Sequence, residues 1–148
     1  MADLTREPWS LFGPDELTEI AARAIPFGND QVVDALQFAA GWATRVAKFD
    51  ADRALAWTDR TVWNEHDLAG SLHQRDFLER SMAQLPTPLR ERLTAWVAEV
   101  DERFRSYTVD DPDGKMAKIA EVDLTGRPWW WRRVPDSGPI VEDLARYV

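Results

Sequence analysis

Apolar residues recur every three or four positions through most of this chain, and this spacing limits its fold more than any other feature. The longest run consists of Val32, Ala35, Leu36, Ala39, Trp42, Ala43, Val46 and Phe49. Such a spacing, held for five turns, predicts an amphipathic helix with one buried face. We therefore predict a mainly α fold: a four- or five-helix bundle with a C-terminal β-hairpin-like segment and a short terminal helix from Pro139.

Capping residues and prolines predict where the helices begin. Asn64 precedes Glu65 and Asp67, a pattern typical of a helix N-terminus, where carboxylates complement the helix dipole. Pro14 and Thr87 are expected at two further starts, since proline is tolerated in a first helical turn. Weaker signals place other starts at residues 29–30 and 50–52.

After residue 108 the sequence pattern changes. Residues 110–114 read Asp-Asp-Pro-Asp-Gly, a strong turn signal whose spacing does not fit an EF-hand calcium loop. Residues 115–123 are ambiguous between helix and strand. We expect a hairpin that pairs residues 116–123 with 128–134, and a C-terminal appendage over residues 108–148 of a single helical domain, 1–148.

Five consecutive residues, Trp129, Trp130, Trp131, Arg132 and Arg133, form the most distinctive motif. Flanking prolines favour an extended run, in which Trp129, Trp131 and Arg133 would share one face. Trp and Arg are enriched at protein–protein hot spots, so all five are candidate partner-binding residues. The alternative is that the hairpin folds back and these indoles cover an open end of the bundle.

Composition excludes several classes of function. The net charge of -8 argues against nucleic-acid binding, which depends on clustered basic residues. With no cysteine, the chain has no disulfides and no thiolate chemistry. No apolar run is long enough to span a membrane, so we expect a cytoplasmic protein. Residues 1–74 carry 12 acids against 6 bases, which would suit a basic partner or serve only to solvate helix faces.

Few residues are candidates for catalysis. His66, His73 and Asp76 fall in one predicted helix, but they match no zinc or di-iron motif. Asp101 and its neighbouring acids are expected on a hydrated helix face. No phosphate-binding loop or nucleophile elbow occurs in the sequence, so we predict neither cofactor nor metal.

The sequence therefore favours a non-catalytic protein-binding module: an inhibitor, immunity-type protein, antitoxin or adaptor that occludes a partner, which could be basic. The alternative is a small-molecule-binding protein or enzyme, in which His66, His73 and Asp76 would be the polar groups of an aromatic pocket. A third hypothesis is a structural domain that forms a homodimer.

Overall fold

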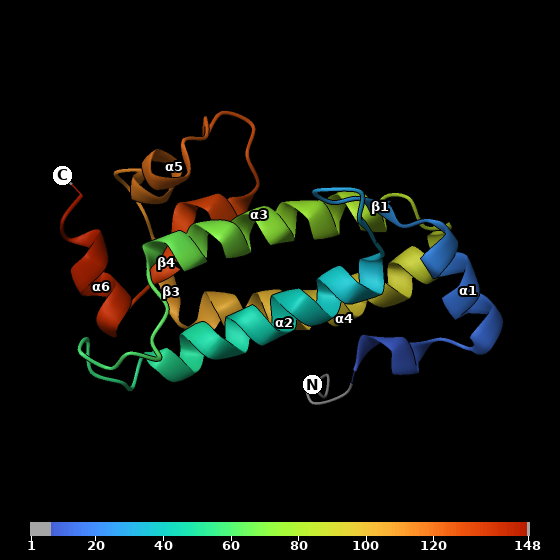
Figure 1. Cartoon of the computed structure of the whole chain (residues 1–148), viewed down its shortest axis with the longest axis horizontal. Helices are drawn as coiled ribbons and strands as arrows, with labels where there is room; N and C mark the ends of the chain where they lie inside the picture. Colours follow the sequence, from blue (N-terminus) through green and yellow to red (C-terminus); the bar gives the residue numbers. More distant parts are fainter. Residues whose placement is uncertain (1–6, 148) are drawn as a thin grey trace. The chain divides into compact units, whose positions relative to one another are not determined.

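The computed structural model describes residues 7–147, and within this range the chain is mainly helical, which confirms the predicted fold class (Figure 1). The α-helices are α1 (Pro14–Ala22), α2 (Ala35–Asp52), α3 (Glu65–Met82), α4 (Thr87–Ser106), α5 (Lys115–Ala120) and α6 (Pro139–Leu144). Short 3-10 helices are η1 (Pro8–Leu11) and η2 (Trp129–Arg132). The strands are β1 (Ile25–Pro26), β2 (Val32–Val33), β3 (Thr108–Asp110) and β4 (Arg133–Pro135). No helix in the described range is long and apolar enough to cross a membrane.

Local capping explains why α3 begins where the sequence predicts. The Asn64 side-chain oxygen accepts the backbone N–H groups of His66 at 2.9 Å and Asp67 at 3.0 Å. The Asp67 carboxylate in turn accepts the N–H of Asn64 at 2.9 Å. This reciprocal pair satisfies N–H groups that a helix N-terminus leaves without partners, so α3 starts at Glu65.

The predicted helix start at residues 50–52 is wrong. Helix α2 continues to Asp52, and residues 53–64 form turns and irregular structure. The Asp52 carboxylate, 4% exposed, accepts Lys48 Nζ at 2.6 Å and the backbone N–H of Trp63 at 2.8 Å. Asp52 therefore ends α2 and anchors the following loop instead of capping a new helix.

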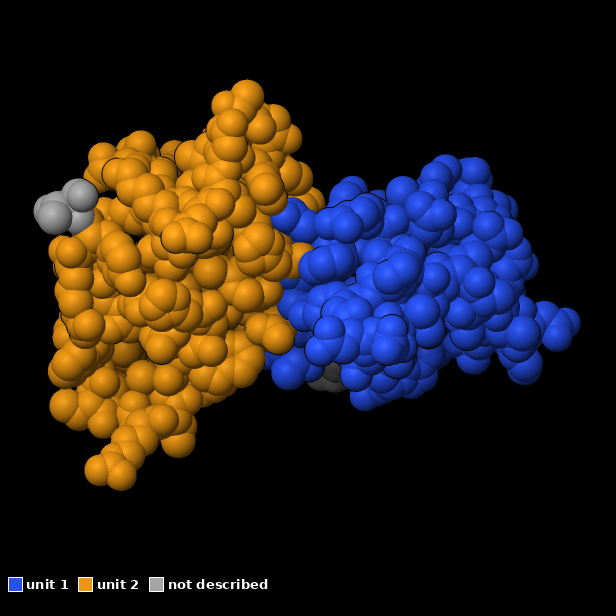
Figure 2. Space-filling model, turned by 45° about the horizontal axis from the view of Figure 1, so that its top comes forward, with its two compact units in different colours: residues 1–44, 74–102 blue, residues 45–73, 103–148 orange. Residues whose placement is uncertain are grey.

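The chain divides into two compact units (Figure 2). Unit 1 contains residues 1–44 and 74–102, and unit 2 contains residues 45–73 and 103–148. The boundaries fall inside α2, α3 and α4, so each unit takes part of all three helices. The C-terminal segment from residue 108, predicted to be an appendage, belongs to unit 2, together with residues 45–73.

A buried ion pair lies in the core of unit 1. Arg75 is 4% exposed, and its Nε and Nη2 donate to the two carboxylate oxygens of Asp101 at 3.1 and 3.0 Å. Trp42 Nε1 donates to the same carboxylate at 2.9 Å. Because Asp101 is only 7% exposed, its predicted place on a hydrated face is wrong. The Asp101 side chain on α4 points toward Arg75 of α3 and not toward solvent.

The C-terminal segment contains a two-stranded sheet, but its strands are not those of the predicted hairpin, and α5 and η2 lie between them in the chain. β3 pairs antiparallel with β4, and Val109 lies opposite Val134. Residues 115–120 form α5, so the expected pairing of 116–123 with 128–134 is wrong. The Asp111 carboxylate accepts the N–H of Met116 at 2.9 Å. This bond stabilises the first turn of α5 and resolves the helix–strand ambiguity in favour of the helix.

Tyr107 provides a pH-dependent contribution to stability in unit 2. It is 1% exposed, and its hydroxyl donates to the backbone oxygen of Val46 at 2.7 Å. Burial, reinforced by the Asp50 carboxylate, raises the pKa of the Tyr107 phenol above its ordinary value. The folded chain therefore holds this proton at pH values where the unfolded chain loses it.

We predict that Tyr107→Phe makes stability less sensitive to alkaline pH. A raised pKa gives stability that is complete below about pH 10, where a free tyrosine titrates, and that is lost as pH rises further. The variant should unfold about 1 kcal/mol more easily at pH 8, because the hydrogen bond is gone. Urea unfolding from pH 8 to pH 11.5 tests this. Parallel stability profiles for wild type and variant above pH 10 would contradict the assignment.

Candidate functional site

The tryptophan run is a 3-10 turn and not a strand. Pro128 precedes η2 in an extended conformation, and the N–H of Trp131 donates to its carbonyl at 3.2 Å. Trp130 is 3% exposed and Trp131 is fully buried, so the expectation that successive indoles face opposite ways is wrong. A helical turn lets two adjacent indoles enter one core, whereas a strand would separate them.

The other three members of the predicted partner-binding set are engaged within unit 2. Trp129 is half-buried, with the Arg105 guanidinium 3.7 Å from its ring centroid. Arg133 donates to the Thr108 hydroxyl at 3.1 Å and to the carbonyl of the same residue. Arg132 is exposed but donates to two carbonyls of the preceding loop. These contacts hold η2, β4 and the loop in place, and they make a free Trp/Arg surface a weaker hypothesis.

The histidines of α3 lie in different surroundings. His66 is solvent-exposed and 3.5 Å from the Glu65 carboxylate. His73 is half-buried, with its ring 4.8 Å from the Trp131 ring in an edge-on contact. Asp76 is also half-buried and belongs to unit 1, whereas both histidines belong to unit 2. The alternative hypothesis, a small-molecule-binding protein or enzyme that uses His66, His73 and Asp76, stays a prediction.

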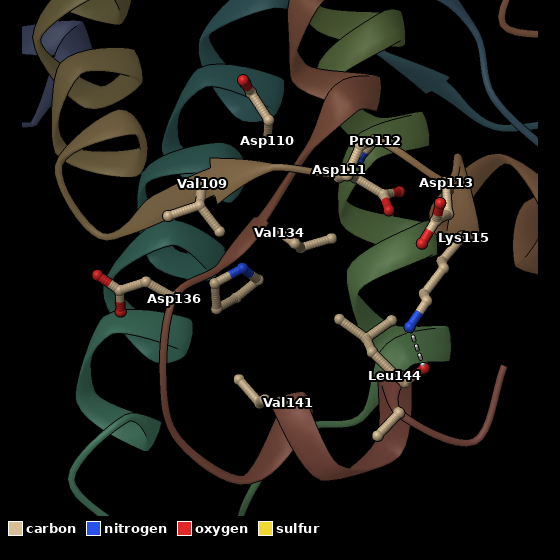
Figure 3. Close-up of a pocket in the computed structure, with 12 residues that line it drawn as sticks. Val109, Asp110, Asp111, Pro112, Asp113, Lys115, Val134, Asp136, Val141 and Leu144 are labelled. Atoms are coloured by element: carbon tan, nitrogen blue, oxygen red, sulfur yellow. Dashed lines mark hydrogen bonds between the residues drawn. The ribbon is translucent and has the colours of Figure 1, made fainter. Parts of the chain in front are cut away.

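A pocket of about 290 Å³ opens in unit 2 between the β3–β4 sheet, the turn that follows β3, and α6 (Figure 3). Its lining residues are Val109, Asp110, Asp111, Pro112, Asp113, Lys115, Val134, Pro135, Asp136, Val141, Leu144 and Ala145. This volume lies at the lower end of the range for ligand sites, which suits an amino-acid side chain better than a nucleotide-sized cofactor.

The floor of the pocket is apolar. Val109 and Val134 lie opposite each other in the β3–β4 sheet, so their side chains share one face. Val141 and Leu144 contribute from α6, and Figure 3 shows all four side chains around the same space. Val109 is 48% exposed and Val141 is 40% exposed. Apolar side chains left this open within a concavity provide a surface that a second molecule could cover.

Carboxylates surround this floor. Asp111, Asp113 and Lys115 lie together on the side of the turn, where Lys115 Nζ donates to the backbone oxygen of Leu144 at 3.2 Å (Figure 3). Asp113 is exposed and has no ion pair or hydrogen bond to its side chain among residues 7–147. The Asp110 side chain points away from α6. Of the four acids in the lining, Asp110 and Asp136 pair with arginines, so the excess of negative charge lies with Asp111 and Asp113 beside Lys115.

At the other end of the pocket, an ion pair holds Asp136 in place. Arg53 donates to the Asp136 carboxylate at 3.0 Å, and the Ser137 hydroxyl donates to it at 2.8 Å. The hydroxyl hydrogen bond, followed by the charge of Arg53, lowers the pKa of Asp136. This carboxylate is therefore ionised throughout the physiological range, and its charge is largely matched by the guanidinium.

Gly138 positions α6, which forms one wall of the pocket. Its φ of 94° lies outside the range that side chains favour, and a Cβ there would be 2.6 Å from the Cα of Arg53. Trp57 supports the same helix from outside the pocket, since its Nε1 donates to Asp143 at 3.1 Å. The wall therefore depends on close backbone contact with the segment after α2.

We predict that Gly138→Ala destabilises unit 2 by roughly 2–4 kcal/mol, because it combines backbone strain with a backbone clash. Gly126→Ala is the matched control: Gly126 also has positive φ, at 73°, but a Cβ there meets nothing within 4 Å. It should cost only about 1 kcal/mol. Chemical denaturation of both variants measures the difference. Equal losses would show that the contact with Arg53 can relax.

No family model, curated protein or solved structure matches this chain. Among residues 7–147, no three His, Asp or Glu side chains gather closely enough to hold a metal ion. The sequence indicates the segments of the pocket separately, as a turn, a strand and a short helix, but not that they meet. The valine at position 109, directly before a run of acids, was the one local signal available.

Proposed function

We propose that this chain is a non-catalytic protein-binding module whose pocket receives a side chain of a partner protein. The observation that carries the proposal is a side-chain-sized concavity in which Val109 and Val141 remain exposed between acidic groups. The overall charge of -8 favours a basic partner, since complementary charge speeds association. This hypothesis shifts the contact surface from the tryptophan run to the face formed by β3, β4 and α6.

Selection of random dodecapeptides displayed on phage against the immobilised protein tests the proposal. The blocking variant is Val141→Arg, which places a long side chain over the pocket at a position exposed enough to tolerate it. The matched control is Val32→Arg, because Val32 is 67% exposed, lies in β2 of unit 1 and does not line the pocket.

Peptides selected on wild type should bind Val141→Arg at least tenfold more weakly and Val32→Arg unchanged. Only Val141→Arg covers the apolar surface of the pocket, so only this variant should prevent a peptide side chain from entering it. Selected peptides that bind both variants like wild type would overturn the pocket as the docking site. Failure to enrich any peptide family over an unrelated acidic protein would overturn the binding-module proposal.

A further inference from the structure

We propose that the pocket recognises an arginine side chain of a basic partner segment, an inference that rests on the proposed function and specifies its ligand. Three features point to this chemistry: an apolar floor, carboxylates beside it, and a volume of about 290 Å³, which is enough to admit one long side chain. An arginine has an apolar stem of three methylenes and a cationic head, so it matches the floor and the rim together.

Asp113 is the group that would hold the guanidinium. Its carboxylate is exposed and has no partner within the described part of the chain, so both oxygens are available to a planar fork of N–H donors. The other acids are already engaged. Asp111 accepts the N–H of Met116, Asp110 pairs with Arg133 at 3.2 Å, and Asp136 pairs with Arg53.

The positive charge of Lys115 is expected to weaken the binding of an arginine in the pocket. Its ammonium lies on the same side of the pocket as Asp113 and is tied to the Leu144 carbonyl, so it opposes a second cation there. Removing the charge while keeping a hydrogen-bond donor should therefore tighten binding of an arginine. This expectation distinguishes charge recognition from simple filling of an apolar cavity, because cavity filling would not respond to Lys115 in this way.

The stem would lie between the two exposed valines. Val109 and Val141 approach the space from the sheet and from α6, and an arginine stem passing between them would cover both. The carboxylates beside the apolar floor disfavour a carboxylate or phosphate ligand and favour a cationic one. A basic peptide segment with one inserted arginine matches both the apolar floor and the negative charge of the pocket.

The test is an NMR titration of the full chain with N-acetylarginine N-methylamide, against the uncharged isostere N-acetylcitrulline N-methylamide. We expect amide shifts confined to residues 109–115, 133–136 and 139–145, with a Kd of about 1–10 mM for so small a probe. The citrulline compound should bind at least tenfold more weakly. Raising NaCl from about 50 to 300 mM should weaken the arginine compound several-fold.

Two variants complete the test. Asp113→Asn should weaken the arginine compound at least fivefold, and Lys115→Gln should strengthen it about threefold. Equal affinities for the arginine and citrulline compounds, or no shifts in the pocket up to 50 mM, would overturn the inference. Such a result would leave the proposed function intact if peptides selected on wild type still lose affinity for Val141→Arg. Arginine binding without any selected peptide would instead overturn the proposed function, and with it the partner segment that the inference names.

A second copy of this chain is the competing occupant of the pocket. Analytical ultracentrifugation of wild type and Val141→Arg between about 10 and 500 μM measures the oligomeric state and decides between a second copy and an arginine-bearing partner. A monomer in both cases supports the arginine-bearing partner. A concentration-dependent dimer that Val141→Arg abolishes would show that the pocket serves self-association and would overturn the inference.

Discussion

Asp101→Ala is expected to lower the free energy of unfolding by about 3–5 kcal/mol, the largest effect of any single polar substitution we predict. The cause is the charge left behind. Arg75 is 4% exposed and donates two hydrogen bonds to the Asp101 carboxylate, so its guanidinium would lose its buried anion and keep the exposed carboxylate of Glu79, 2.7 Å from Nη1. Trp42 Nε1 would lose the same acceptor.

Urea unfolding followed by circular dichroism measures the loss, with Glu91→Ala as the control. Glu91 is an exposed carboxylate of the same helix, and its removal should change stability by less than about 0.5 kcal/mol. The double variant Arg75→Met/Asp101→Leu should recover part of the loss, since neither charge then remains buried. A cost below about 1 kcal/mol for Asp101→Ala would show that Arg75 can turn to solvent.

Trp131→Ala is expected to cost about 3–5 kcal/mol, because it removes a fully buried indole from the core of unit 2. The His73 ring lies edge-on to Trp131, and the Arg127 guanidinium is 5.3 Å from the indole centroid. A cavity at this position would therefore loosen α3 and the loop before η2 as well as η2 itself.

Trp57→Ala provides the comparison, since Trp57 is 47% exposed in the same unit and should cost clearly less, about 1–2 kcal/mol. Chemical denaturation measures both variants. Acrylamide quenching adds an independent readout, because loss of Trp57 should remove a readily quenched component of the fluorescence and loss of Trp131 a protected one. Equal costs for the two substitutions would contradict the burial of Trp131.

The helices were predictable where local signals act alone. Asn64 caps α3 with its own side chain, and Thr87 begins α4 where a proline follows it. These boundaries depend on backbone hydrogen bonds within one turn, which the neighbouring residues determine. Asp52 is also a residue type that often caps helices, but here it was misleading, because its carboxylate accepts hydrogen bonds from Lys48 and from the distant N–H of Trp63. A cap residue is ambiguous when a tertiary partner competes for it.

The candidate site was less predictable, because it joins segments that are not adjacent in the sequence. Val109 and Val134 become neighbours only through the pairing of β3 with β4. The predicted partner for the tryptophan segment was residues 116–123, which instead form α5. The observed pairing joins strands that α5 and η2 separate in the chain, so no local turn signal could indicate it.

By itself, the sequence determined the helical class, several helix starts and the acidic character, since periodicity, capping and charge are local or additive properties. Only the tertiary structure decided which polar and aromatic residues are buried. The spacing of Asp101 predicts an acid on a hydrated helix face, whereas in the fold Asp101 is buried and pairs with Arg75. The sequence left open whether Trp131 is a partner-binding or a bundle-covering residue, and in the fold it is a core residue. Burial depends on which faces meet, and that requires contacts between residues far apart in the chain.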